Sequence, residues 1–214
     1  MKTAIAAVAL IALTALTACG SDSGDDTATD PGGSGRGNPM PTEPPAAPGP
    51  VHTRGLATVM DTVMDTGRPE LCLGAVAESY PPQCGGPEIR GWDWGDQHGA
   101  FDQQGKTRWG QFAVTGRWDG TTFTVTDAIP AALYDGMAIE EPTVPEPGRS
   151  YDQAELEQIA GKLGKELPGA QGSFGDQGHV FIDAMYDDGS LQAWADEEYG
   201  ENVVVVVPAL VDGT

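Results

Sequence analysis

Two alternating stretches of sequence, separated by Asp119 and Gly120, constrain the fold of this chain most strongly. Residues 108–118 and 121–126 place apolar and polar side chains in turn, which is the pattern of a strand with one buried face. An Asp-Gly pair between two such stretches favours a two-residue turn, because that turn needs positive φ angles. The sequence therefore predicts a β-hairpin at this place.

Three further runs make the region before residue 128 rich in predicted strands. Residues 55–63, 71–76 and 88–94 have strand-like patterns and are bounded by turn-forming residues. Five short strands without a helical pattern are typical of a small barrel or sandwich. We therefore expect a β-rich domain over residues 54–127, folded as a small barrel, and an OB-like barrel is our specific choice.

A proline-rich linker at residues 128–149 separates this domain from a region with a different periodicity. Residues 150–153 are a candidate capping box, and Pro168-Gly169 would end the helix that follows it. The apolar residues with helical spacing between these points are Leu156, Ile159, Ala160, Leu163 and Leu167.

A strand, a second helix and a second strand follow. Residues 180–186 alternate as a strand, Ser190 is a candidate cap for a short helix that ends at Gly200, and residues 203–207 form a β-branched run. The side chains expected to face inward are Val180, Ile182, Ala184, Tyr186, Leu191, Trp194 and Ala195. The order αβαβ predicts a small two-layer module over residues 150–214, so the whole chain belongs to the α+β class.

The beginning of the chain is an apolar segment with one positive charge. Lys2 supplies that charge, and residues 3–18 carry none. As a helix they would span roughly 24 Å at about 1.5 Å per residue, which is short of a bilayer core of about 30 Å. We therefore expect residues 1–18 to be a signal peptide rather than a spanning helix.

The residues that end this segment, Leu16-Thr17-Ala18-Cys19, resemble the lipobox of a bacterial lipoprotein. The resemblance implies cleavage before Cys19, a diacylglycerol on its thiol, and a lipid anchor at the extracytoplasmic face of the cell membrane. Two or more acyl chains hold a protein stably on a bilayer. The alternatives are an ordinary secretory signal with a chance cysteine and an uncleaved membrane anchor.

Residues 19–53, which begin at the lipidated cysteine, have the composition of a disordered tether. Residues 20–51 are mainly Gly, Pro, Ser, Thr, Asp and Ala, and they contain no aromatic side chain. Such a stretch buries too little apolar area to offset its ordering entropy. A flexible tether of about 30 residues reaches roughly 30 Å, which would lift the folded part away from the lipid head groups.

Cys72 and Cys84 remain as a pair once Cys19 is assigned to the lipid, because the chain has three cysteines. Disulfides persist in exported proteins, and a closed loop of about 13 residues would contribute roughly 3 kcal/mol. A reactive or metal-binding pair is the alternative, although the chain has no C-x-x-C motif and no histidine near either cysteine in sequence. We expect a structural disulfide.

The charge balance bears on possible partners. The chain carries 32 acidic and 11 basic residues, a net charge of −21, and residues 128–214 are its more acidic part. Such a surface repels phosphate backbones and anionic lipids, so we expect no nucleic-acid partner and membrane contact through the lipid anchor. Solubility is the simplest interpretation of the charge, and weak binding of cations or of a basic partner is the alternative.

Residues 71–76, 79–87, 91–94 and 116–125 carry a family resemblance. They are similar to segments of a family of uncharacterised exported and envelope proteins of actinobacteria. The resemblance covers mainly the β-rich domain and, more loosely, the C-terminal αβ pattern. It implies an envelope location and brings no catalytic residue with it, because no activity is attached to that family.

The sequence lacks the common catalytic motifs. Its three histidines, His52, His98 and His179, are not in H-E-x-x-H spacing, and neither a G-x-S-x-G nor a Walker A motif is present. Residues 183–189 resemble a calcium loop only faintly, because alternating ligands and a closing glutamate are absent, and a solvated turn is the better interpretation. We expect no metal and no cofactor.

Residues 92–98 contain the most suggestive local group of side chains. Trp92 and Trp94 would share one face of a strand, and Asp96 and His98 follow them. Exposed tryptophans stack on sugar rings and carboxylates bind hydroxyl groups, so these four residues are a candidate ligand-binding site. Burial of the tryptophans in or beside the barrel core is the simpler alternative.

Two functions from different classes remain. We expect a non-catalytic lipoprotein that binds an envelope protein or a glycan, or that supports another envelope component. The alternative is an extracytoplasmic hydrolase that uses Asp93, Asp96 and His98. A polar pocket that brings those three side chains together would favour the hydrolase. Burial of Trp92 and Trp94 away from a polar cleft would argue against both glycan binding and hydrolysis.

Overall fold

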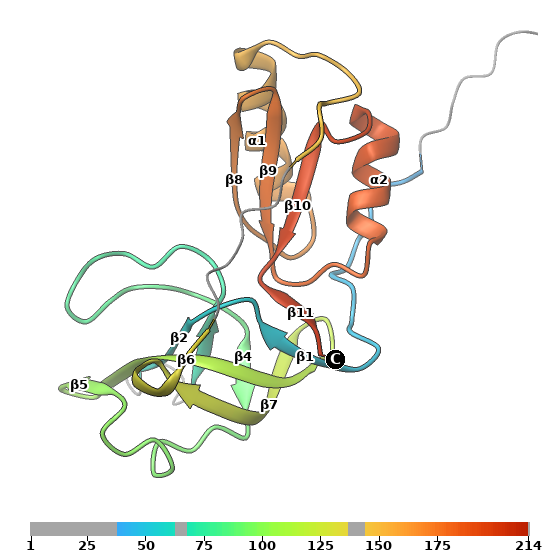
Figure 1. Cartoon of the computed structure of the whole chain (residues 1–214). Helices are drawn as coiled ribbons and strands as arrows, with labels where there is room; N and C mark the ends of the chain where they lie inside the picture. The colour runs from blue at the N-terminus through green and yellow to red at the C-terminus, as the bar shows by residue number, and fades with distance from the viewer. Residues whose placement is uncertain (1–37, 63–67, 137–143, 214) are drawn as a thin grey trace, which may run out of the picture. The chain divides into compact units, whose positions relative to one another are not determined.

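The computed structural model describes residues 38–62, 68–136 and 144–213 (Figure 1). The predicted signal peptide at residues 1–18, Cys19 and the first part of the predicted tether lie outside the described residues. Within the described part of the chain, no helix is both long enough and apolar enough to span a membrane.

Five strands close into a barrel. They are β2 (Ala57–Thr62), β3 (Glu70–Cys72), β4 (Glu88–Arg90), β6 (Thr107–Trp118) and β7 (Thr122–Pro130). The ring runs β2–β3–β4–β7–β6 and closes where β6 pairs with β2. The pair β4–β7 is parallel and the other neighbours are antiparallel, which is the arrangement of an OB-like barrel. The predicted barrel and the α+β class are confirmed.

The predicted hairpin forms the longest part of the barrel wall. Asp119 and Gly120 make the turn between β6 and β7, and Gly120 has a φ of 96°. The Asp119 carboxylate accepts hydrogen bonds from the amides of Thr121 (2.9 Å) and Thr122 (2.7 Å). Because β6 has 12 residues, it pairs with β2 over its first half and with β7 over its second half. This sharing closes the ring.

Alternating side chains of these strands fill the barrel. The fully buried residues of this core include Val51, Val59, Leu71, Phe112, Val114, Phe123 and Leu210. Trp92, Trp94 and Phe101, from the segment after β4, add three aromatic rings around Phe112. The barrel is therefore a packed core with an aromatic cluster at its side.

The C-terminal region is a two-layer module (Figure 1). Its elements are α1 (Gln153–Glu166), β8 (Ala170–Asp176), β9 (His179–Ala184), α2 (Ser190–Tyr199) and β10 (Val204–Pro208). The sheet order is β10–β9–β8, with β10 parallel and β8 antiparallel to β9. Both helices share one buried cluster with β9, so they cover the same face of the sheet. All four predicted elements are present, and β8 is an additional strand.

Carboxylate side chains cap both helices. Asp152 and Glu155 form a capping box at α1, two residues later than the predicted one. At α2, the Asp187 side chain accepts a hydrogen bond from the amide of Leu191 (3.0 Å). Ser190 makes no capping hydrogen bond through its side chain, so that prediction is wrong. A carboxylate reaches the first-turn amides from outside the helix, and its charge favours the positive end of the helix dipole.

Residues 38–53 pack on the folded chain, in contrast to the predicted tether. β1 (Pro50–Thr53) lies between β6 and the C-terminal strand β11 (Leu210–Asp212). Val51 is fully buried in the barrel core, and the Thr53 hydroxyl accepts a hydrogen bond from the amide of Val114 (3.1 Å). The tether prediction therefore does not hold for this part of residues 19–53.

Backbone carbonyls explain why a proline-rich segment packs here. The indole of Trp118 donates to the carbonyl of Pro45 (2.9 Å), and the indole of Trp194 donates to that of Asn38 (3.0 Å). A proline has no amide donor but keeps its carbonyl acceptor, and a buried indole N–H needs such a partner. The segment therefore supplies acceptors for two indole N–H groups although it contributes few apolar side chains.

Two other predicted boundaries shift. β7 continues to Pro130, inside the predicted linker at residues 128–149, because residues 128–130 pair with β6. β11 lies within the predicted module at residues 150–214 but joins the sheet of the barrel through β1. Residues 137–143 of the linker lie outside the described residues.

Candidate functional site

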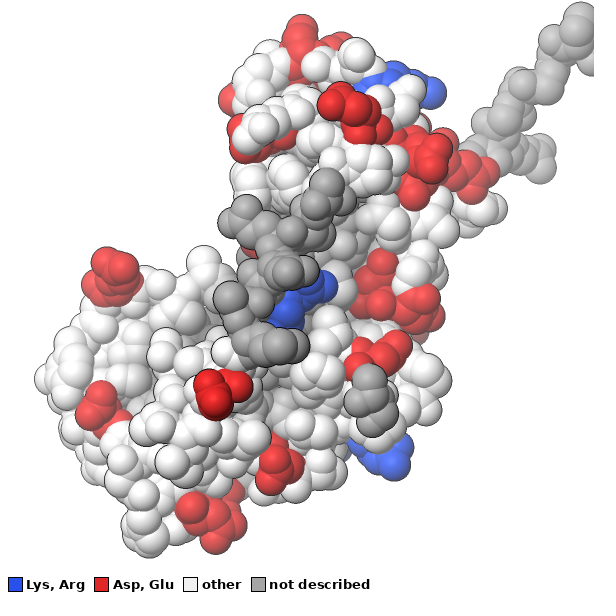
Figure 2. Space-filling view, viewed as in Figure 1, with Lys and Arg blue, Asp and Glu red and all other residues white. Residues whose placement is uncertain are grey.

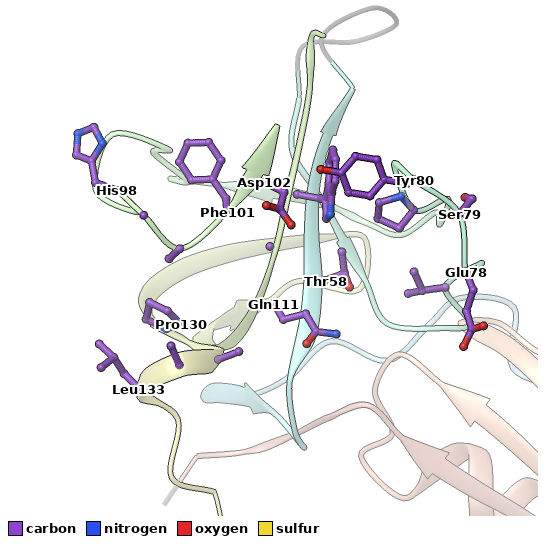
Figure 3. A pocket seen from close by; sticks show the side chains of 18 of the residues that line it. Thr58, Glu78, Ser79, Tyr80, His98, Phe101, Asp102, Gln111, Pro130 and Leu133 are labelled. Atoms are coloured by element: carbon purple, nitrogen blue, oxygen red, sulfur yellow. The ribbon is translucent and has the colours of Figure 1, made fainter. Parts of the chain in front are cut away.

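A groove of about 840 Å³ lies on the outer wall of the barrel (Figure 3). Its lining comes from residues 76–82 between β3 and β4, 98–102 at the start of β5 (Asp102–Gln104), 109–111 of β6, and 130–133 with the short 3-10 helix η1 (Ala131–Leu133). Thr58 of β2 also lines it. Closure of the barrel brings these distant segments together.

One wall of the groove is a loop that is fixed at both ends. A disulfide joins Cys72 and Cys84, whose Cα atoms are 5.8 Å apart, so the predicted disulfide is confirmed. Inside that link, the amide of Ala77 donates to the carbonyl of Gln83 (2.8 Å). A cross-link of this kind removes alternative conformations of the loop. The wall at residues 76–82 is therefore preformed.

The groove presents apolar side chains to solvent. Tyr80 is 67% exposed and Leu133 is 76% exposed. The Tyr80 ring stands edge-on against the buried Trp109, with ring centroids 5.0 Å apart. Figure 3 shows Tyr80 and Leu133 on opposite sides of the groove, with Gln111 and Thr58 between them. Large apolar side chains that remain exposed at a concave surface are typical of a binding site.

The fully charged side chains of the groove are acidic. Glu78 and Asp102 line it and are exposed, and its described lining contains no lysine or arginine. His98 is the only histidine in the described lining. The visible surface has the same bias, because acidic side chains are scattered over it and basic ones are few (Figure 2). The local potential therefore favours a neutral or positively charged ligand.

β6 has a gap in its strand pairing where it lines the groove. On the side away from β2, β5 pairs with β6 as far as Trp109, and β7 pairs with it from Phe112 onward. Gly110 and Gln111 fall between these two partners, and no strand of the described chain lies opposite them on that side. Both residues line the groove, which therefore reaches a strand edge as well as side chains.

Trp92 and Trp94, which the sequence predicts as candidate ligand-binding residues, pack in and against the barrel core. Trp94 is 7% exposed and belongs to the core, and Trp92 is half-buried against the same core. Their ring centroids are 5.3 Å apart, and the centroid of Trp92 lies 4.8 Å from that of Phe112. This is the simpler of the two interpretations made from the sequence. Rings packed in this way are not presented for stacking on a sugar.

Asp93, Asp96 and His98 are not joined into one group. The Asp93 carboxylate accepts a hydrogen bond from the amide of Gly95 (2.7 Å), which is a local turn contact. Asp96 is exposed, and within the described residues no hydrogen bond or ion pair connects either carboxylate to His98. His98 does line the groove, at one end of it (Figure 3). Ligand binding by Asp96 and His98 stays a prediction.

The acidic residues at 183–189 serve the start of α2. Asp187 accepts a hydrogen bond from the amide of Leu191, and Asp188 accepts one from the amide of Ser190 (3.0 Å). Hydrogen bonding by Ser190 lowers the pKa of Asp188. Over residues 38–62, 68–136 and 144–213, no three His, Cys, Asp or Glu side chains are grouped as potential metal ligands.

The phenol of Tyr186 has a strongly raised pKa, and its contacts indicate a structural role. Burial, assisted by a hydrogen bond to Asp212, raises the pKa of Tyr186 to about 12. The phenol donates to the Asp212 carboxylate at 2.9 Å. Tyr186 belongs to the barrel core and Asp212 to β11, so this bond fastens the C-terminal strand to the barrel.

The apolar residues of the groove carry little signal in the sequence. Tyr80 carried one usable signal, because it lies beside Pro81 between two paired cysteines, where an aromatic side chain has no strand in which to pack. Leu133 carried none, since its exposure depends on η1 standing at the rim of the groove.

Comparisons of the chain with protein-family models, with curated proteins and with solved structures found no match.

Proposed function

We propose that this chain is a lipid-anchored, extracytoplasmic protein of the cell envelope that binds another envelope component through the groove on its barrel. The role is non-catalytic. The described groove supplies apolar contact, a strand edge and acidic side chains. Such a surface can hold a partner, whereas covalent chemistry needs an activated nucleophile and a base within hydrogen-bond reach.

One observation carries this proposal: Tyr80 and Leu133 remain exposed on two sides of a concave surface. An occupant that covered them would gain roughly 25 cal/mol for each Å² of apolar surface removed from water. The disulfide already holds the loop that carries Tyr80, so binding orders little additional chain. A preformed apolar groove of this kind is suited to reversible binding.

The location rests on two features. Residues 16–19 resemble a lipobox, which would place Cys19 at the mature N-terminus with its lipid. The Cys72–Cys84 disulfide fits an oxidising compartment outside the cytoplasm. With Cys19 at the mature N-terminus, the residues that follow it in sequence would connect the lipid to the folded part of the chain.

The hydrolase alternative has less support. It requires His98 to act with Asp93 or Asp96, and the Asp93 carboxylate is engaged in its own turn. His98 shares the groove with Asp102, but no hydrogen bond or ion pair between them is found in the described chain. Binding is therefore the function that the groove supports best.

Photo-crosslinking in cells tests whether the groove is occupied. A benzoylphenylalanine placed at position 133 samples the groove rim, and one at position 174 is the matched control. Phe174 is also an exposed apolar side chain (51%), but it lies on β8 of the other module. We expect an envelope adduct from position 133 and none from position 174. Equal adducts from both positions, or none from position 133, would contradict the proposal.

A separate experiment tests the anchor. Cys19→Ala removes the thiol that would carry the lipid, and we expect the protein to appear in the soluble extracytoplasmic fraction or the medium. Cys84→Ala is the control, because it removes a cysteine without touching the lipobox and should leave the protein in the membrane fraction. Retention of the Cys19→Ala variant in the membrane would contradict the lipid anchor and leave the groove proposal to its own test.

A further inference from the structure

We propose that the groove binds an extended peptide segment of a partner protein, and that this segment carries aliphatic side chains next to a lysine or arginine. The inference rests on the proposed function and specifies the ligand class of the same site. It follows from three properties of the groove, which are the gap along β6, the apolar side chains on its two sides and the acidic residues at its rim.

The gap along β6 favours a peptide over other ligands. Gly110 and Gln111 line the groove at the point where β5 has ended and β7 has not yet begun. A strand edge offers amide and carbonyl groups that pair with another backbone, as in the addition of a peptide strand to a sheet. The gap spans only Gly110 and Gln111, so it has room for about one pair of backbone hydrogen bonds from an extended peptide, and a glycan has no peptide backbone to supply them.

The apolar surface beside the gap suits alternate side chains of such a peptide. In an extended chain, residues two apart point to the same side. Tyr80 and Leu133 face the groove from opposite sides, and Val76 (37% exposed) extends the wall that carries Tyr80. Aliphatic side chains would cover these groups, and they do not require the dense array of polar partners that sugar hydroxyls need.

The rim supplies charge complementarity. Glu78 and Asp102 are exposed carboxylates that enter the lining from two different segments. The described lining has no cation to neutralise them, and the chain as a whole has a net charge of −21. A basic residue in the ligand therefore gains a favourable potential, and an acidic one is repelled. Because both carboxylates are exposed, this contribution should weaken as salt is added.

Peptide selection on the full chain tests this inference. A random octapeptide library displayed on phage is panned against the detergent-solubilised protein, and the affinities of the selected peptides are measured by fluorescence anisotropy. We expect enriched sequences with alternating aliphatic residues and a lysine or arginine, and with few acidic residues. N-methylation of the central backbone amides should weaken a selected peptide about fivefold, which corresponds to the loss of one backbone hydrogen bond.

Matched variants locate the binding. Leu133→Ala and Tyr80→Ala should each weaken a selected peptide about tenfold, the size of one truncated apolar contact. Phe174→Ala removes an equally apolar exposed side chain outside the groove and should change nothing. Glu78→Gln combined with Asp102→Asn should weaken binding about threefold at low salt and have no effect at high salt.

Several results would overturn the inference: no enrichment, acidic consensus sequences, equal binding to the wild-type and Leu133→Ala proteins, or indifference to N-methylation. Failure of this inference remains distinguishable from failure of the proposed function. If the adduct from position 133 is a glycan and the peptide selection is empty, the groove is a binding site for another ligand class. If neither experiment finds an occupant, both proposals fail.

Discussion

The Cys72–Cys84 disulfide should both stabilise the fold and hold the shape of the groove. The effect of its removal can be predicted with a magnitude. Cys72 is 3% exposed and packs with Met60 and Trp109, so alanine is the suitable replacement at both positions. Serine would place a hydroxyl in an apolar cluster. The two cysteines are 12 residues apart, so the link closes a loop of about 13 residues.

The loop length sets the expected magnitude. Opening a loop of about 13 residues gives the unfolded chain conformational entropy worth about 3 kcal/mol at 25 °C. For a folded part of this size, about 3 kcal/mol corresponds to a fall in Tm of about 6–12 °C. The same change frees residues 76–82, so the Cys72→Ala/Cys84→Ala variant should also bind groove ligands more weakly.

Urea unfolding followed by tryptophan fluorescence measures this loss. The oxidised wild-type protein, the reduced wild-type protein and the double variant are compared, and extrapolation to zero urea gives each free energy of unfolding. The reduced protein and the double variant should unfold together, both below the oxidised protein. If the double variant kept its free energy of unfolding within about 0.5 kcal/mol of the oxidised protein, the reasoning from loop entropy would be refuted.

Three other predictions concern hydrogen bonds that hold strands in place. Asp119→Ala should lower the free energy of unfolding by about 1 kcal/mol, and Asp119→Asn should lower it by less. Backbone hydrogen bonds from Thr121 and Thr122 lower the pKa of Asp119, so the wild-type protein should lose this stability as pH falls below about 4, and the Ala variant should not. The pKa of Tyr186 is raised to about 12, so its protonated phenol stabilises the fold below pH 10, and this contribution is lost between pH 10 and about 12. In an alkaline unfolding titration, Tyr186→Phe should abolish that loss. The Gln192 side chain donates to the carbonyl of Val204 and accepts from the amide of Val206 (both 2.8 Å), so it covers backbone groups of β10, an edge strand of its sheet. Gln192→Ala would expose these groups to pairing with another chain, so we expect it to promote self-association in sedimentation velocity. Monomeric behaviour of the variant at high concentration would contradict this role.

Much of the fold could be predicted because local periodicity carries it. The alternation around Asp119-Gly120 identified the hairpin, and each of the five barrel strands overlaps a predicted run. Val180, Ile182 and Ala184 are all buried, as their period of two predicts. These elements bury one face regardless of the rest of the chain, so the sequence shows them directly.

Elements that depend on a distant partner could not be predicted. β1 has the composition of a tether, and it becomes a strand because β6 and β11 pair with it from both sides. β8 contains two glycines and one large apolar residue, Phe174, so its pattern is weak until β9 pairs with it. Trp92 and Trp94 have the same alternation whether they face inward or outward, and only their packing on Phe112 decides between the two.

The groove could not be predicted from the sequence for the same reason. Tyr80, Gln111 and Leu133 belong to separate segments that meet only when the ring of strands closes. Of the candidate residues proposed from sequence, His98 lies in the groove and Trp94 lies in the core. A local motif search favours residues that are neighbours in the chain, and this site is built from residues that are not.

Hydrogen–deuterium exchange of the whole chain tests most directly whether the groove is the binding surface. The purified protein is measured by mass spectrometry alone and after addition of a solubilised envelope extract. If the groove is the binding surface, we expect slower exchange at residues 76–82, 109–111 and 131–133, with α1 and α2 unchanged. Slower exchange confined to the helices of the C-terminal module, or no change at the groove, would contradict it.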